Sequence, residues 1–204
     1  MYKRQITSDV TLAAGNTYKL SGEYIVEEGA TLHIEEGVKI IAVYDDIADY
    51  ILVKQGGKIN AVGTPDKPIV MTSEKEEPGA WGGIHICGRA HTNAEGGKGS
   101  SEIGGAVYGG NNDADNSGTL QYIRLEYTGF AFDEEHEANG ISFYGVGNGT
   151  IVDHCQAYKG SDDGFEFFGG SVNVSNLVAV SCSDDSFDWT EGWNGKGTNL
   201  VAYQ

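Results

Sequence analysis

The sequence predicts an all-β fold, a right-handed parallel β-helix in which successive coils of the chain stack along one axis. Short motifs recur with a period in the low twenties of residues. The apolar residues occur in short segments bounded by glycine and show no helical periodicity. The 31 glycines among 204 residues are about twice the usual share. No stretch of roughly ten residues carries apolar side chains at helical spacing.

The N-terminal third of the chain contains strand-length apolar segments separated by turns. They lie at residues 10–12, 24–26, 31–34, 38–41 and 58–62. Residues 29–34 align with residues 56–61, which predicts a coil of 27 residues (56 − 29) at this point. Leu32 is then expected to lie over Ile59 after one circuit of the solenoid.

The repeat is clearest near the C-terminus. Residues 161–167 and 183–189 share a Ser-Asp-Asp start at a spacing of 22 residues (183 − 161), and residues 139–143 form a fainter copy. Residues 176–180 and 199–203 recur at a spacing of 23 (199 − 176). A leucine-rich repeat has a similar period but needs an LxxLxLxxN pattern that this chain lacks, whereas a β-sandwich or a propeller stays open as an alternative.

We expect one domain, residues 1–204, that is an incomplete solenoid. The chain starts abruptly on basic residues and stops within the apolar run 199–203, so we expect a fragment that lacks its C-terminal part. Residues at about 88–118 are rich in Gly, Asn, Asp and Ser and are predicted to form a loop insertion. Loops of this length often carry function.

Charge and composition argue against several classes of partner. The net charge is −17, with 13 Lys and Arg against 30 Asp and Glu. Duplex nucleic acid and anionic membranes both require a basic surface, so neither is expected as a partner. The chain has no transmembrane-length apolar run and no export signal.

Cysteine and histidine spacing argues against a zinc or iron–sulfur site. The three cysteines form no CxxC motif, and the five histidines form no HxH or HExxH pair. Cys155 and Cys182 lie in consecutive repeats, so either a disulfide in an exported protein or buried free thiols is consistent with the sequence.

An acidic ladder is the strongest candidate site. Phe165 and Phe167 flank Glu166 in one repeat, and Asp188 takes the place of Glu166 in the next. If the aromatic rings point inward, the carboxylates point outward. Coil stacking then sets the ladder at roughly 4.8 Å per step. The ladder consists of Asp162, Asp163, Glu166, Asp184, Asp185 and Asp188.

Three interpretations of the ladder stay open. The four aspartates, Asp162, Asp163, Asp184 and Asp185, cap turn amides, or they bind a hard cation such as Ca²⁺. The third interpretation is catalysis by the six carboxylates, because paired acids about 5 Å apart suit a retaining glycosidase. A lyase reaction is disfavoured because no arginine falls in the repeat that carries the ladder.

Two further candidates lie outside the ladder. Asp113, Asp115 and Ser117 resemble the opening of a calcium loop, but Arg124 occupies the position of the bidentate Glu of an EF-hand, so only a looser Ca²⁺ site is predicted. Trp193, between Gly192 and Asn194, has no apolar neighbour in sequence and is the predicted ligand-binding residue, with its ring stacked on a sugar.

Several motifs together resemble a family of secreted and surface lipoproteins of Bacteroidetes-type bacteria that have right-handed parallel β-helix repeats. They are found at residues 29–37, 67–73, 81–84, 115–120 and 145–150 and in the two Ser-Asp-Asp repeats. The resemblance covers nearly the whole chain. It implies a secreted or cell-surface location, in full length as an outer-membrane lipoprotein, and implies no established reaction. The export signal and the C-terminal half of that family are missing here.

The sequence therefore predicts a cell-surface or secreted β-helix protein with a binding or structural role. Its expected partner is a glycan or a surface protein, and Ca²⁺ is the one cofactor expected, as a stabilising ion. No catalytic residue is assigned. The alternative is a polysaccharide-active enzyme, a glycoside hydrolase or a lyase, that uses the acidic ladder.

Overall fold

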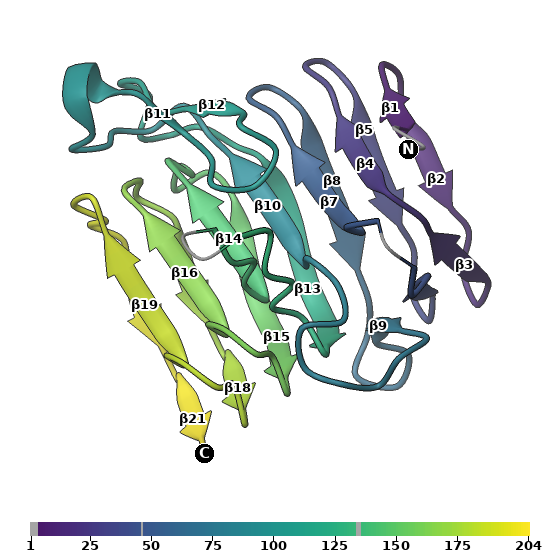
Figure 1. Cartoon of the computed structure of the whole chain (residues 1–204). Coiled ribbons are helices and arrows are strands. Elements are labelled where there is room, and N and C mark those ends of the chain that lie inside the picture. The colour runs from purple at the N-terminus through teal and green to yellow at the C-terminus, as the bar shows by residue number, and fades with distance from the viewer. Residues whose placement is uncertain (1–3, 46, 134–135) are drawn as a thin grey trace.

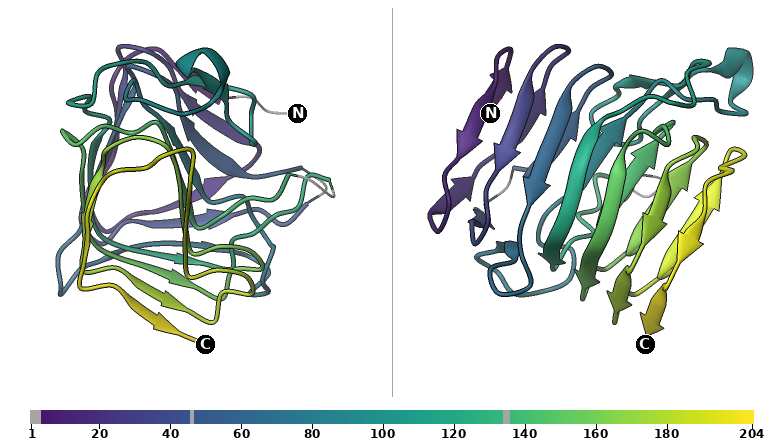
Figure 2. Two further views of the ribbon diagram at one scale, coloured as in Figure 1. Left: turned by 90° about the vertical axis from the view of Figure 1, so that its left-hand side faces the viewer. Right: turned by 180° about the vertical axis from the view of Figure 1, so that it is seen from behind.

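The computed structural model describes residues 4–45, 47–133 and 136–204 and shows a parallel β-helix (Figure 1). The predicted fold class is therefore confirmed. Regular structure in the described residues is β-strand apart from one 3₁₀ turn, η1 (Glu95–Gly97). Viewed along the axis in the left panel of Figure 2, the coils superpose, with the two termini on opposite ends of the stack in the right panel.

Two long parallel sheets form most of the wall of the solenoid. The seven-stranded sheet A consists of β1 (Arg4–Ile6), β4 (Glu23–Val26), β7 (Tyr50–Val53), β10 (Ile84–Cys87), β14 (Ile141–Tyr144), β16 (Phe165–Phe168) and β19 (Phe187–Thr190). The main path of the twelve-stranded sheet B consists of β2 (Val10–Leu12), β5 (Thr31–Ile34), β8 (Lys58–Val62), β13 (Gly118–Glu126), β15 (Ile151–Tyr158), β17 (Asn173–Ser175) and β20 (Gly197–Thr198). Its remaining strands are β3 (Thr17–Leu20), β6 (Lys39–Ala42), β9 (Ile69–Ser73), β18 (Val178–Val180) and β21 (Val201–Tyr203).

The strand register confirms the repeats identified in the sequence. Leu32 of β5 pairs with Ile59 of β8, as the alignment of the first coils predicts. Phe165 of β16 pairs with Phe187 of β19 across the 22-residue repeat, and the rings are stacked with centroids 5.6 Å apart. Because every coil places apolar side chains over apolar side chains, one continuous core fills the solenoid.

One corner of the solenoid is built from residues with a left-handed backbone. Tyr122, His154, Asn176 and Asn199 occupy the same position in successive coils and have φ between 51° and 55°. This conformation is uncommon outside glycine. The rings of Tyr122 and His154 stack at 4.6 Å, and Asn199 Nδ2 donates to Asn176 Oδ1 at 3.0 Å. Contacts between coils therefore stabilise the bend that separates the two halves of sheet B.

The segment between β10 and β13, residues 88–117, crosses the outside of sheet A and is called the arm below (Figure 1). It contains η1 and an antiparallel pair, β11 (Gly99–Ser100) and β12 (Val107–Tyr108). Ile103, Ala106 and Tyr108 of the arm share a second core cluster with side chains of sheet A, including Leu52 and Phe168. The arm is thus held by apolar burial as well as by hydrogen bonds.

The turn after β19 fastens the arm to the last coils. Tyr108 donates its hydroxyl hydrogen to Glu191, with both oxygens of that carboxylate at 2.9 Å, and the Thr92 hydroxyl donates to the same carboxylate. The three cysteines, Cys87, Cys155 and Cys182, are buried free thiols. Of the two cysteine states that the sequence allows, the structure shows the reduced one.

Candidate functional site

The outward face of sheet A changes from apolar to acidic along the solenoid axis. One row of paired residues runs along it in the order Ile25, Leu52, His85, Ser142, Glu166 and Asp188. The arm buries the apolar side chains of this row. The acidic end carries Glu166 of β16 opposite Asp188 of β19, which confirms the predicted pairing of these two residues.

The acidic end opens into a cavity of about 250 Å³ lined by eight carboxylates. Six of them are the residues of the acidic ladder, Asp162, Asp163, Glu166, Asp184, Asp185 and Asp188, and the other two are Glu102 and Glu137. We call this cavity the acidic pocket. Within the described chain, its lining includes no lysine, arginine, histidine or aromatic side chain. Among the residues that the structure describes, the pocket wall is thus formed by carboxyl groups without a cationic side chain.

Backbone geometry fixes the aspartates of the pocket at the turns that precede β16 and β19. Asp163 Oδ1 accepts the backbone N–H of Asp185, 22 residues on, at 2.8 Å. The side chain of Asp163 is buried, whereas Asp184 in the next coil is exposed. The capping interpretation is therefore correct for Asp163, but its second oxygen is left for another partner.

The buried amide side chain of Asn139 holds the Glu166 carboxyl group in place. Asn139 Nδ2 donates to Glu166 Oε2 at 2.5 Å and to Ser142 Oγ at 3.1 Å. Asn139 precedes β14, so this contact joins the coil of β14 to the coil of β16. The amide fixes the orientation of the Glu166 carboxyl group at the base of the acidic pocket.

Burial and mutual repulsion raise the pKa values of the pocket carboxyl groups. Burial, reinforced by the charges of Glu102 and Asp163, raises the pKa of Glu166 to about 9. Burial, with a smaller contribution from neighbouring carboxylates, raises the pKa of Asp163 to about 7 and that of Asp162 to about 6. Burial also raises the pKa of Glu102. The pocket therefore retains protons at neutral pH that ordinary carboxyl groups release.

Five of these residues form two groups suited to holding a cation. One carboxylate oxygen each from Asp162, Asp163 and Asp184 lie within 4.8 Å of one another, and so do oxygens from Asp163, Glu166 and Asp188. Hard cations such as Ca²⁺ bind oxygen ligands at about 2.3–2.6 Å. Each group therefore matches the spacing of ligands around one ion.

Glu102, Glu137 and Asn139 were not identified from the sequence. Glu102 comes from the arm, and Glu137 and Asn139 from the segment before β14. Glu102 and Glu137 lie outside the Ser-Asp-Asp repeats, whereas Asn139 begins the fainter copy at residues 139–143, in register with Asp163. The signal for Glu137 is the acidic run at residues 133–137, which is equally typical of a solvated loop.

The aspartate side chains of the predicted calcium loop accept hydrogen bonds from backbone amides. Asp113 Oδ1 accepts the backbone N–H of His91 at 3.1 Å, and Asp115 Oδ2 accepts that of Arg89 at 2.9 Å. Ser117 is buried, at the end of the arm. These hydrogen bonds close the base of the arm, which accounts for both aspartates without an ion.

Trp193 does not stand alone at the surface, so the premise of its predicted sugar-binding role is wrong. Its ring stacks on Phe167 with centroids 4.5 Å apart, and its Nε1 donates to the Val172 carbonyl oxygen at 3.1 Å. Trp189, which pairs with Phe167 in register, is instead 61% exposed. The turn after β19 brings Trp193 back over Phe167, which its glycine and asparagine neighbours did not indicate.

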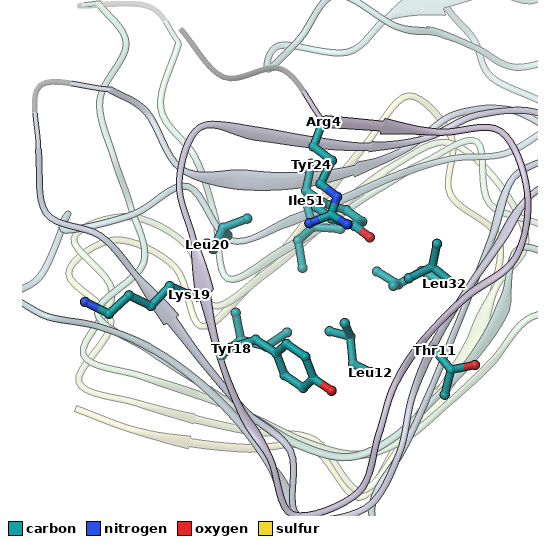
Figure 3. A pocket seen from close by; sticks show the side chains of 11 residues that line it. Arg4, Thr11, Leu12, Tyr18, Lys19, Leu20, Tyr24, Leu32 and Ile51 are labelled. Atoms are coloured by element: carbon teal, nitrogen blue, oxygen red, sulfur yellow. The ribbon is translucent and has the colours of Figure 1, made fainter.

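A second cavity, of about 220 Å³, lies inside the first coil and differs in character (Figure 3). Its walls are largely apolar and include Leu12, Leu20 and Leu32, with the Arg4 guanidinium 5.7 Å from the centre of the Tyr24 ring. Lys19 points away from this cavity and pairs with Glu74 at 2.6 Å. No pocket carboxylate reaches this end of the stack, so the two cavities are separate features.

The stacked parallel coils define a parallel β-helix protein, which carries the acidic pocket on the outer face of sheet A. The family model described as pectate-lyase like beta helix domain matches residues 4–204, and the chain belongs to this family. Neither the curated proteins nor the solved structures include a significant match to the chain. The described residues contain no helix of the length and apolarity that crossing a bilayer requires.

Replacing Glu166 by glutamine is expected to stabilise the metal-free protein at alkaline pH. The folded-state pKa of Glu166, about 9, lies above its ordinary value of 4.5, so the folded state binds the extra proton. The stability that Glu166 contributes by binding this proton is therefore fully present below pH 4.5 and is lost as the pH rises toward 9. Glutamine accepts the Asn139 hydrogen bond without charge, and we expect it to raise the free energy of unfolding at pH 8 by at least about 1 kcal/mol.

Urea unfolding of both proteins in a chelator, at pH 8 and at pH 4, measures this effect. The two proteins are expected to converge at pH 4, where Glu166 is protonated in both states. A variant that is less stable than the parent at pH 8 would show that the carboxylate is accommodated without strain.

Proposed function

We propose that this β-helix domain binds Ca²⁺ in the acidic pocket and that the ion braces a secreted or cell-surface protein whose role is to bind a glycan or a surface protein. The observation that carries the proposal is the convergence of eight carboxyl groups in a pocket whose described lining includes no cationic side chain. Two carboxylates one coil apart repel by about 1 kcal/mol in water and by several times more in a partly buried site. A bound divalent cation removes that repulsion.

The donor set favours Ca²⁺ over other metal ions. Every lining side chain of the described pocket offers carboxylate oxygen, and none offers nitrogen or sulfur. Zinc and the later transition metals prefer imidazole or thiolate, whereas Ca²⁺ takes six to eight oxygen ligands in flexible geometry. Mg²⁺ demands a stricter octahedron and retains its waters, so it fits a pocket lined by carboxylates alone less well.

The position of the pocket supports a bracing role. The residues that could hold an ion come from the turns before β16 and β19 and from both of those strands. An ion here ties two successive coils of the solenoid together, and Glu102 of the arm and Glu137 of the segment before β14 add negative charge to the same pocket. Extracellular calcium modules with affinities of about 10⁻⁴–10⁻³ M work in this way, and the resemblance to secreted and surface lipoproteins of Bacteroidetes-type bacteria supports such a location.

The pocket itself does not favour direct sugar stacking. Sugar rings bind well against exposed aromatic faces, and the described lining of the acidic pocket has none. A glycan or protein partner is therefore proposed to bind elsewhere on the solenoid, while calcium sets the rigidity of the coils that present it. This combination describes a binding and structural module.

Calcium is expected to raise the melting temperature in a saturable manner, by about 5–10 °C at saturation, because it binds the folded state preferentially. The double variant Asp163→Asn plus Asp185→Asn is expected to lose most of that increment. Asparagine at position 163 still accepts the Asp185 amide but brings no charge. Differential scanning fluorimetry across micromolar to millimolar Ca²⁺, with Mg²⁺ as the matched ion, measures both effects.

A melting temperature that is indifferent to calcium over that range contradicts the proposal. An equal response to magnesium would indicate general screening of the carboxylates. A calcium response that survives the double variant would show that Asp163 and Asp185 do not hold the ion.

A second candidate function is polysaccharide hydrolysis, and one observation favours it. Glu166 is protonated at neutral pH because of its raised pKa, and a carboxylate oxygen of Asp188 lies within 4.8 Å of it. A protonated acid next to a second carboxyl group is the arrangement of a retaining glycosidase. A lyase is disfavoured, because Arg89 pairs with Glu28 and Arg124 with Glu126, and neither arginine lines the pocket.

Release of reducing ends from a panel of neutral and acidic polysaccharides tests hydrolysis. An enzyme is expected to lose at least about 100-fold in rate in the Glu166→Gln variant, the usual size of a general-acid contribution. Activity that is unchanged in this variant, or absent with every polysaccharide, would leave the binding role alone.

A further inference from the structure

We infer that the cavity inside the first coil binds a linear aliphatic carboxylate of about eight carbon atoms. The carboxylate contacts the Arg4 guanidinium, and the carbon chain lies against the apolar walls that Leu12, Leu20 and Leu32 provide. This cavity, of about 220 Å³, is separate from the acidic pocket. The inference therefore goes beyond the proposed function and does not depend on calcium.

The strand register places Arg4 in an interior row of sheet A. The row runs from Arg4 through Tyr24, Ile51, Ile84, Ile141, Phe165 and Phe187. Its members from Ile51 to Phe165 are buried in the core. Side chains of one row share one face of a sheet, so the Arg4 side chain lies on the core side of β1. Figure 3 shows it pointing into the cavity. A guanidinium thus occupies a position that is apolar in the later coils.

The described chain supplies no acceptor for this guanidinium. Arg4 contacts the Tyr24 ring, whose centre lies 5.7 Å from its Cζ atom, and it forms no salt bridge with a described residue. The buried Tyr24 hydroxyl also lacks a hydrogen-bond partner among the described residues. Attraction between opposite charges increases where water is partly excluded, so a guanidinium beside apolar walls gains from an anionic partner. An anion in the cavity supplies the acceptor that the described residues do not.

Exposure and burial around the cavity match a molecule with one charged end and one apolar end. Arg4 is exposed, so a ligand can reach its guanidinium from solvent, whereas Leu20 and Leu32 are buried. The guanidinium offers two parallel N–H donors, which fit the two oxygens of a carboxylate. The neighbouring apolar side chains favour a hydrocarbon chain over a second polar group. An aliphatic carboxylate has both features.

The volume of the cavity sets the length of the carbon chain. A water molecule occupies about 30 Å³, so 220 Å³ has room for about seven groups of that size. Octanoate, with eight carbon atoms, is of this size. Each methylene group that leaves water strengthens binding about fourfold. Affinity is therefore expected to rise steeply up to this length and to level off for longer chains, whose ends extend beyond the walls.

The acidic pocket is too far away to repel an anion at this site. Sheet A runs from β1 through β4, β7, β10 and β14 to β16, the strand that carries Glu166. Five steps of about 4.8 Å separate these two strands by roughly 24 Å. At physiological ionic strength charges are screened over about 8 Å. The charge of the acidic pocket therefore acts only weakly on a carboxylate beside Arg4.

Titration of the intact chain with sodium octanoate tests the site. Isothermal calorimetry at physiological ionic strength measures affinity, and the Arg4 Nε–H resonance reports the position of the ligand. We expect one octanoate per chain. Arg4→Gln is expected to weaken binding at least about 10-fold, the size of a charge-assisted hydrogen bond. Lys19→Gln is the matched control and is expected to bind like the parent, because Lys19 points away from the cavity and pairs with Glu74.

A ligand series on the parent protein needs no variant. Hexanoate, which is two methylene groups shorter, is expected to bind about 15-fold more weakly than octanoate. Octylammonium has the same chain and the opposite charge, and it is expected to bind at least about 10-fold more weakly because Arg4 repels it. This comparison decides alone where circular dichroism shows that Arg4→Gln does not fold.

Three results overturn the inference. The first is the absence of saturable octanoate binding to the parent, which leaves water as the occupant of the cavity. The second is equal weakening in Arg4→Gln and Lys19→Gln, which indicates general attraction by positive charge. The third is octylammonium binding as tight as that of octanoate, which indicates apolar burial without a role for Arg4.

Discussion

Parallel backbone hydrogen bonds hold each coil of the solenoid to the next, and their register decides where every side chain lies. Val178 pairs with Val201, and Glu166 pairs with Asp188, because β18 and β16 are in register with the strands one coil later. In such a structure, a residue type that recurs in the sequence becomes a row in space. Favourable and unfavourable contacts are therefore both repeated along the axis.

The interior rows gain from this repetition. Phe143 stacks on Phe167 with ring centroids 5.0 Å apart, and Trp193 covers the other side of Phe167. The same register forces acidic side chains together on the outer face of β16 and β19. Burial is the main cause of the raised pKa values of Asp162, Asp163 and Glu166, and the neighbouring carboxylates raise them further. In the function proposed above, a bound cation offsets this repulsion.

The fold could be predicted from the sequence to a large extent because the repeats state the register directly. The pairing of Leu32 with Ile59 and that of Phe165 with Phe187 both follow from motif spacing alone. The composition of the pocket could be predicted only in part. The six ladder residues lie in the repeat, whereas Glu102 and Glu137 reach the pocket from segments that do not repeat. The contact of Trp193 with Phe167 could not be predicted from its glycine and asparagine neighbours, because the turn after β19, and not the local sequence, brings the ring over Phe167.

The arm covers part of the outer face of sheet A, and this cover has a physical reason. Leu52 and Tyr144 face outward, and the arm buries them beneath Ile103 and Tyr108. Without that cover the outer face would expose a continuous apolar patch, which soluble proteins rarely tolerate. The arm also carries Glu102 to the acidic pocket, so apolar burial at one end of the face places a carboxyl group at the other end.

The central claim is that the register-enforced carboxylates at the C-terminal end of sheet A exist to hold cations. Anomalous diffraction from crystals grown with Mn²⁺ or Tb³⁺ in place of Ca²⁺ tests it most directly. The account predicts an anomalous peak within about 2.6 Å of carboxylate oxygens of the acidic pocket. Crystals saturated with the metal that show no anomalous peak among these carboxylates would contradict it.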